Sequence, residues 1–353
     1  MEPSTTKFLF FPWRTLPHHL AVLVVMFFAA VTSAAETGVA RPDSTQTESA
    51  TPKPAQTGPS LAFVKEHTLS FLTIVLPHNS LRNSKTLHNW PFFAFSVPGW
   101  KSEAYLKKDF NPLLSVKVGI AGDAGFGGIN TQVETSVDWF HLLELGIQPN
   151  LGTALNYGET ATFMGTYNPE KKDYDQDAFF TEYIYGVKFK AALTIPLLMA
   201  LLPKSDWTKI ILKATGEYAY NGYTNADDGE VWKVGSENMV NGFRYRYGGV
   251  LIYILPFQYV PMAMVSFNVS GFKHAHDFNP VYKDYNPGFK TISITPMLSV
   301  NVIKGWNGML MAAISRDRTF ENRHYETTEE ILQKQIGSEW DLRAIMFILS
   351  RKF

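Results

Sequence analysis

The feature that most constrains this chain is a period of two in its hydrophobicity, repeated in segment after segment. In residues 129–138, for example, Ile129, Val133 and Val137 occupy odd positions, whereas every even position is polar. Successive side chains of a β-strand point to opposite faces, so this pattern predicts strands with one apolar and one polar face. Six segments follow the pattern closely: 112–121, 129–138, 143–156, 179–193, 207–220 and 289–303.

Six further segments complete the set of expected strands. Two of them, 68–76 and 90–97, are apolar on both faces, and in the remaining four the alternation is weaker. The total is twelve strands, with ten or fourteen as the alternatives. The four weaker segments are 242–253, 257–271, 306–316 and 339–353.

Residues 247–272 allow a second interpretation, because these 26 residues carry no charge and are long enough for a membrane-spanning helix. However, Pro256 and Pro261 would interrupt a helix. Beyond them, Val265 and Phe267 alternate with serine and asparagine. We therefore expect two strands joined by a tight turn at 254–256.

The connections between the expected strands alternate in length. After a fairly short connection at 122–128, shorter and longer connections follow one another, and the long ones are polar and rich in Asp, Asn and Gly. This arrangement is typical of an up-and-down barrel with short turns at one end and long loops at the other. The shorter connections are 139–142, 194–206, 254–256 and 304–305, and the longer ones are 157–178, 221–241, 272–288 and 317–338.

The C-terminal segment, EWDLRAIMFILSRKF, has Ile345, Phe347 and Leu349 at alternate positions and ends on Phe353. It resembles the closing strand of bacterial outer-membrane β-barrels, where the terminal aromatic residue is a recognition signal for assembly. The resemblance implies an all-β, antiparallel up-and-down transmembrane barrel over residues 61–353. It also implies that outer-membrane lipid and the barrel-assembly machinery are partners. The segment departs from the family pattern on its inner face, which is less polar than usual, and at one further position: Ala344, Met346, Ile348 and Arg351.

The N-terminal residues predict export. Lys7 and Arg14 precede an apolar run at 20–32, and Ser33-Ala34-Ala35 follows it, which is the order of a secretory signal peptide cleaved after Ala35. Residues 36–60 are mostly Ser, Thr, Pro and Ala, a composition that predicts a disordered linker. We thus expect a signal peptide at 1–35, a linker at 36–60 and a barrel whose even strand number places both termini in the periplasm.

The composition excludes several classes of protein. With 32 basic and 32 acidic residues the net charge is zero, so the basic excess of a nucleic-acid-binding protein is absent. There is no cysteine, which excludes disulfides and a lipoprotein anchor. The sequence does not specify the oligomeric state.

Charged residues at the polar positions of the strands are expected to line the barrel lumen. The basic ones cluster on neighbouring strands and form a predicted basic wall that would favour anions in a water-filled path. The alternative is a lumen filled by paired charges. The expected lumen-lining residues are Lys117, Glu134, Asp138, Glu144, Glu182, Lys188, Lys190, Lys209, Lys213, Glu217, Arg244 and Arg246.

Motifs for catalysis or for a cofactor are weak. His274, His276 and Asp277 form a His/Asp cluster at the base of a long loop, and a solvated loop explains it equally well. His78-Asn79-Ser80 is similar to the centre of the Thr-His-x-Ser-Asn-Gly motif of outer-membrane phospholipases, but its flanking residues differ. The Gly-rich stretch 122–128 joins two strands, so it lacks the helix of a phosphate-binding loop. We expect no catalytic residue, metal or cofactor.

Three functions remain as hypotheses. The first is a small passive channel for hydrophilic solutes, lined by the basic wall. The second is a closed barrel whose outer loops serve adhesion or a structural role. The third is an outer-membrane hydrolase, and the sequence favours a protein that is not an enzyme.

Overall fold

The computed structural model describes residues 60–78, 89–125, 127–156, 164–196, 207, 209–235, 237–321 and 330–353. These residues belong to one compact unit, Thr57–Phe353. The predicted signal peptide and all of the predicted linker except Ser60 lie outside the described residues.

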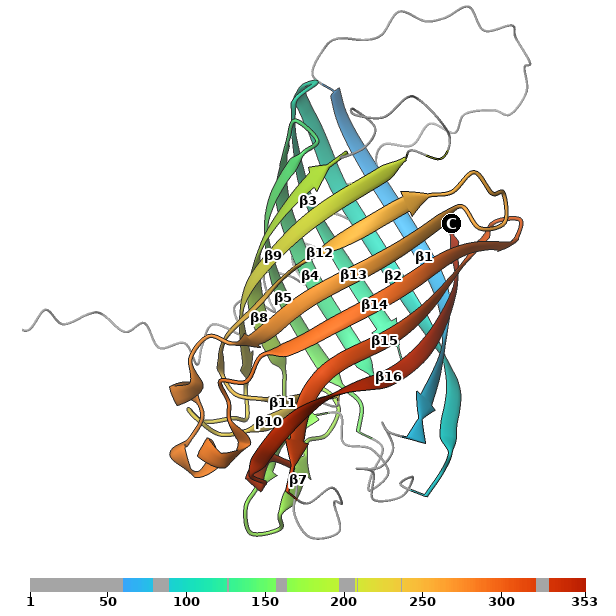
Figure 1. Ribbon diagram of the computed structural model, residues 1–353. Helices are drawn as coiled ribbons and strands as arrows, with labels where there is room; N and C mark the ends of the chain where they lie inside the picture. Colours follow the sequence, from blue (N-terminus) through green and yellow to red (C-terminus); the bar gives the residue numbers. More distant parts are fainter. Residues whose placement is uncertain are drawn as a thin grey trace, which may run out of the picture. The chain divides into compact units, whose positions relative to one another are not determined.

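Twelve antiparallel strands close into a barrel in which each strand pairs with its neighbours (Figure 1). The closing pair joins the first strand to the last, from Thr68 opposite Lys352 to Val75 opposite Ile345. The predicted fold class, an all-β antiparallel up-and-down barrel of about twelve strands, is therefore confirmed. The strands are β1 (Ser60–Pro77), β2 (Phe92–Asn111), β3 (Leu114–Gly125), β4 (Gly128–Trp139), β5 (Leu143–Ala154), β8 (Ile184–Ile195), β9 (Ile210–Tyr223), β12 (Gly242–Ile254), β13 (Met262–Phe272), β14 (Thr291–Ile303), β15 (Trp306–Phe320) and β16 (Gln335–Lys352).

The two faces of the barrel wall differ in the way the alternation predicts. Residues directly opposite each other in an antiparallel pair lie on the same face, so the register assigns every strand residue to the inner or outer face. Large apolar side chains such as Val118, Leu145, Phe189, Val265 and Leu310 are exposed on the outer face. Most of the charged side chains of the strands lie on the other face, which encloses the lumen.

β1 and β2 are much longer than expected. β2 extends to Asn111 rather than ending near Val97. Its second half carries charges on both faces, since Lys107 is opposite the inward Lys117 whereas Lys108 is opposite the outward Val116. Alternation cannot identify a strand whose two faces are both charged.

Two other strand boundaries differ from the prediction for local reasons. β8 begins at Ile184 rather than 179, and Phe180 has a left-handed backbone with φ of 66°. β13 begins at Met262 because Pro256 and Pro261 lie in the connection from β12. The predicted hairpin is confirmed, although its connection spans 255–261 and is not a tight turn. Among the described residues, no helix has the length and apolar composition needed to cross a membrane.

The two ends of the barrel are unlike. At one end, here the turn end, short connections such as 112–113 and 304–305 join the strands, and the C-terminus lies there (Figure 1). The N–H of Phe353 donates to the carbonyl of His67 at 2.9 Å, so pairing with β1 continues to the last residue. The long connections lie at the opposite end, here the loop end, together with the short turn between β3 and β4.

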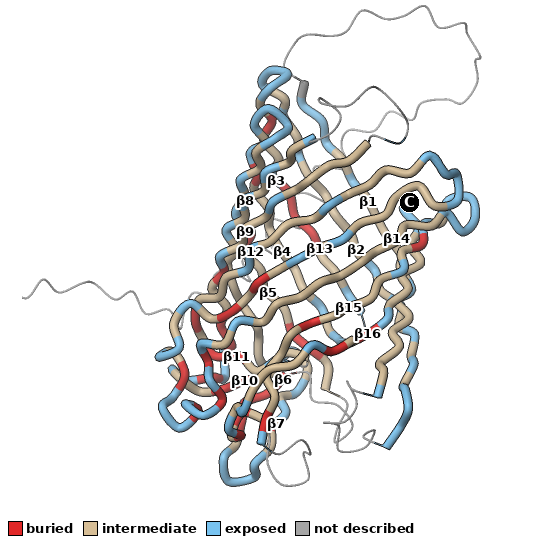
Figure 2. Tube along the Cα trace, in the orientation of Figure 1, coloured by how far each residue is buried: buried red, intermediate tan, exposed pale blue. Residues whose placement is uncertain are grey.

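The long connections, expected to be polar loops, fold into a separate layer of structure that we call the cap. It consists of the described parts of 155–183, 224–241, 273–290 and 321–334. Trp232, Tyr167, Val240 and Ile331 are almost completely buried in it. Figure 2 shows buried segments around β6, β10 and β11. Each loop is too short to bury these side chains alone, but four loops together bury them. Its elements are the four-stranded sheet β11-β10-β6-β7, formed by β6 (Met164–Asn168), β7 (Asp173–Gln176), β10 (Trp232–Val234) and β11 (Glu237–Met239), and the 3₁₀ helices η3 (Ala275–Asp277), η4 (Pro280–Tyr285) and η5 (Glu330–Leu332).

Candidate functional site: the lumen wall and the cap

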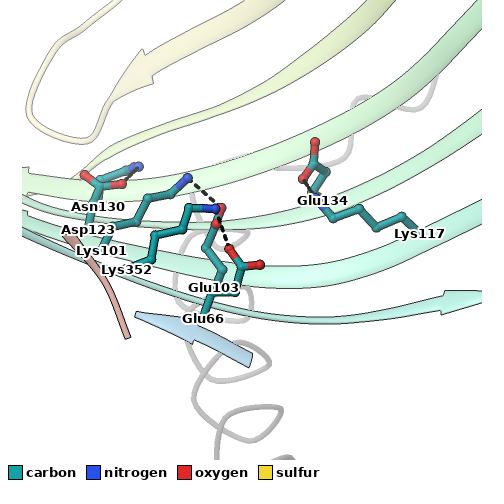
Figure 3. A network of polar contacts seen from close by, with 8 residues as sticks. All are labelled: Glu66, Lys101, Glu103, Lys117, Asp123, Asn130, Glu134 and Lys352. Carbon is teal, nitrogen blue, oxygen red and sulfur yellow. Dashed lines mark hydrogen bonds and ion pairs between the residues drawn. The ribbon is translucent and has the colours of Figure 1, made fainter. Parts of the chain in front are cut away.

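Charged side chains on β1–β4 and β16 form a network of short contacts on the inner face (Figure 3). Lys117 Nζ lies 2.9 Å from Glu134 Oε2 and 4.7 Å from the centre of the Tyr105 ring. The other contacts are those of Lys101 with Glu103 at 2.5 Å, Lys352 with Glu66 at 2.9 Å and Asn130 with Asp123 at 3.1 Å. Of this network, the sequence predicted only Lys117 and Glu134 as lumen residues.

The basic residues of the predicted wall lie together on three adjacent strands. Lys188 and Lys190 are on β8, Lys213 is on β9, and Arg246 is on β12 next to β9. The register places Glu217 of β9 directly between Lys190 and Arg246, so the three side chains form one row.

Three of the predicted acidic lumen residues lie on the two strands at one side of this wall. Glu134 and Asp138 lie on β4 and Glu144 lies on β5, and β5 pairs with β8. Glu144 Oε2 lies 3.5 Å from Lys213 Nζ. Carboxylates therefore offset part of the positive charge of the wall.

Two predicted lumen residues lie beyond the ends of their strands. Glu182 precedes β8, and its carboxylate accepts a hydrogen bond from Thr224 Oγ1 at 2.5 Å, so it belongs to the base of the cap. Lys209 immediately precedes β9, and its carbonyl accepts a hydrogen bond from the N–H of Ile254. Both residues were assigned to the lumen because the predicted strands began three to five residues too early.

The remaining predicted residue, Arg244, connects the barrel to the cap. Its Nη1 lies 2.7 Å from Glu237 Oε2 of β11, and its guanidinium lies 5.0 Å from the centre of the Phe272 ring. It is thus tied to the cap and is not a free member of the basic wall.

The cap also packs directly on the inner face at the loop end. Tyr223 and Ile184 lie opposite each other on the inward face of β9 and β8, and Ala154 ends β5. All three join Trp232 and Met239 in one cluster. The cap therefore covers the part of the lumen mouth formed by β5, β8 and β9.

A second ion-paired group, on β15 and β16, was missed in the sequence. Arg343 Nη2 lies 2.6 Å from Asp317 Oδ2, and Arg343 Nε donates to Ser315 Oγ at 3.2 Å. A bulge between Ala344 and Leu342 turns Arg343 toward the lumen. Strict alternation assigns Arg343 to the outer face, so only the bulge reveals its role.

Electrostatics in the cap differ between its interior and its surface. Burial raises the pKa of Tyr285 and of Tyr282. At the surface, hydrogen bonds from Lys171 and Asn168 lower the pKa of the Asp175 carboxyl. The interior phenols thus remain protonated and uncharged at neutral pH.

The two histidine motifs make few contacts in the described part of the chain. His276 Nε2 is 3.8 Å from Asp277 Oδ1, and the rings of His274 and His276 lie 5.0 Å apart. No group of three or more metal-binding side chains occurs among the described residues. His78 Nδ1 lies 3.0 Å from the Trp90 carbonyl, whereas Asn79 and Ser80 lie outside the described residues.

No protein-family model matches this sequence, and no curated protein matches it. Similar solved structures include a bacterial polysaccharide outer membrane secretin, with 9% identity and a TM-score of 0.34 over 82% of this chain and 98% of the other. A Pseudomonas aeruginosa FadL homologue has 9% identity and a TM-score of 0.29 over 82% and 90% of the two chains. The TodX deltaS2S3 mutant monoaromatic hydrocarbon channel has 10% identity and a TM-score of 0.26 over 85% and 91%. Likenesses this low transfer no substrate or activity to this chain.

Proposed function

We propose that this chain is a bacterial outer-membrane β-barrel that conducts small hydrophilic solutes and prefers anions. The location in a membrane is supported by the closed barrel, which leaves no backbone edge unsatisfied in lipid. Exposed aromatic residues also support it, because Trp139, Trp207 and Phe257 lie near the turn end and Tyr247 lies farther toward the loop end. If the turn end faces the periplasm, both termini are periplasmic. β16 is then the strand that the barrel-assembly machinery would recognise.

The main support for the channel function is that three of the described basic side chains on the inner face have no ion-pair partner. Among the described residues, Lys188, Lys190 and Arg246 have no carboxylate within ion-pair distance, and Arg246 is exposed. An unpaired charge removed from water is very unfavourable. These side chains therefore require a hydrated lumen, and their charge would attract anions.

Single-channel recording of the full chain in a planar bilayer tests this function. We expect steady ohmic steps with anion preference, and replacing Lys188, Lys190 and Arg246 together by glutamine should shift the selectivity toward cations. Lys283→Gln in the cap is the matched control and should leave the selectivity unchanged. A folded barrel, verified by a heat-dependent gel shift, that carries no current would contradict the channel function.

A second function is supported by one observation, the packed core of the cap. A cap with its own buried aromatic residues presents a defined outer surface, as a closed adhesive or structural barrel would need. Current through the wild-type barrel distinguishes the two functions, because a closed barrel carries none. The described residues add nothing to support the hydrolase hypothesis.

A further inference from the structure

A band of apolar side chains crosses the inner face from β12 to β1. Met264, Met297, Met311 and Met346 lie opposite one another on the consecutive strands β13, β14, β15 and β16. We call these four residues the methionine row. Ile252 of β12 continues the row on one side of it, and Ile74 of β1 continues it on the other.

The row lies on the inner face because its neighbours along each strand are exposed outside. Val265, Leu310 and Ile345 each adjoin a methionine of the row, and all three are exposed apolar residues of the outer face. The six side chains from Ile252 to Ile74 cross five strand-to-strand steps of about 4.8 Å, so the row extends over roughly 24 Å of the wall. This is long enough for an extended alkyl chain.

The side chains of the row are not packed away from the lumen. None of the six is buried, and each remains partly exposed. An apolar surface left facing a hydrated lumen is unfavourable, and such patches commonly mark binding grooves. Methionine is flexible and polarisable, which suits a surface that accommodates an apolar molecule of variable shape.

The polar residues that border the row carry no charge. Toward the loop end, Ser266 lies opposite Thr295. Toward the turn end, Ser299 lies opposite Met309, and the inward pair after that is Asn301 and Asn307. The nearest inward cations on β16 are already ion-paired, Arg343 with Asp317 and Lys352 with Glu66. Among the described residues, no unpaired cation lies beside the row to bind an anionic head group, whereas hydroxyl and amide side chains can hydrogen-bond to an uncharged group.

We propose that the methionine row is a binding site for an uncharged amphiphile, an alkyl chain that carries a hydroxyl, ether or amide group. The chain lies along the methionines, and its polar group bonds to the serine, threonine or asparagine side chains beside them. This site goes beyond the proposed channel function and rests on the register, the exposure and the charges of the described strand residues.

Photolabelling of the full chain in lipid vesicles tests the site. The probe is a decyl alcohol that carries a diazirine, and mass spectrometry of peptides locates the labelled residues. We expect saturable labelling at Met264, Met297 and Met311 that excess unlabelled decanol suppresses. Labelling of the outward neighbours Val265 and Leu310 from the lipid should neither saturate nor be suppressed.

Variants and a second probe sharpen the test. Met297→Gln combined with Met311→Gln should raise the half-saturating probe concentration about tenfold, because two apolar contacts are lost. The matched control, Leu310→Ala, changes the outer face next to Met311 and should leave that concentration unchanged. If the gel shift shows that the double variant does not fold, the proposal is tested on the wild type alone, by comparing labelling of the inward methionines with labelling of their outward neighbours.

Two results would overturn the proposal. Unsaturable labelling at the methionines would show that they only fill the lumen. Equal saturation by the decanoic acid analogue would show that the head group need not be uncharged. Photolabelling does not require a current, so the binding site and the channel function can each be disproved independently of the other.

Discussion

Single residues contribute differently in the barrel and in the cap. Ion pairs on the inner face, such as Lys117 with Glu134, are partly exposed to solvent, and pairs of this kind add about 0–1 kcal/mol to stability. Their main effect is on the field inside the lumen. In the cap, by contrast, a few completely buried side chains account for the packing, and Trp232 is the largest of them.

Replacing Trp232 by alanine should destabilise the cap without unfolding the barrel. The indole is 0% exposed and lies 5.4 Å from the Tyr223 ring, and truncating a buried aromatic residue costs about 3–5 kcal/mol. Faster amide hydrogen exchange in 164–176 and 231–240, with an unchanged heat-dependent gel shift, is the expected result.

Two variants make this prediction specific. Trp232→Phe should have a smaller effect, because the indole Nε1 has no hydrogen-bond partner among the described residues and the phenyl ring preserves part of the contact. Trp207→Ala removes an exposed tryptophan at the turn end and should leave exchange in the cap unchanged. Equal effects of Trp232→Ala and Trp207→Ala would contradict the role given to Trp232.

At the scale of elements, close approach of β12 and β13 depends on a glycine. A Cβ on Gly248 would overlap the backbone carbonyl oxygen of Phe267, which cannot move without disturbing the strand pairing. On the neighbouring strand β9, a Cβ on Gly216 would meet no atom within 4 Å. Close packing therefore requires a glycine at position 248, whereas no neighbouring atom requires one at position 216.

Gly248→Ala should reduce the fraction of folded barrel. The added Cβ would push β12 and β13 apart and weaken the hydrogen bonds between them, while β12 stays paired with β9. The measurement is the urea midpoint of the heat-dependent gel shift, and Gly216→Ala is the matched control that should keep the wild-type midpoint. A Gly248→Ala barrel as stable as the wild type would mean that the strands can separate at no cost.

Predictability also differed between elements. Segments with one apolar and one polar face, such as β4 and β14, were predicted to within a residue or two at each end. β2 was predicted only in its first part, because charges on both faces of its second half remove the alternation. Lys101 and Glu103 were consequently missed as lumen residues.

At the scale of the whole molecule, the cap and barrel form one structure at the loop end. Inward-facing residues of β8 and β9 enter the core of the cap, and Arg244 ties β12 to β11. The cap thereby covers one side of the lumen mouth. The lumen itself is asymmetric, because the unpaired cations lie on β8 and β12 whereas the methionine row crosses β13–β16.

Replacing residues 232–239 by a short Gly-Ser linker should increase the conductance of the barrel. These residues form β10 and β11 and supply Trp232 and Met239 to the cluster over the mouth, so their loss removes material from the path. Single-channel recording gives the conductance. An unchanged value would place the cap beside the conducting path.

By itself, the sequence determined the strand class, the closure into about twelve strands and the polarity of most inward positions. This was possible because alternation within one segment is enough to show which of its side chains face inward, without knowledge of the other segments. Only the tertiary structure decided the cap, the inward turn of Arg343 and the methionine row. Those features depend on which residues of different strands and loops lie opposite each other, and register and loop packing are set by the whole barrel.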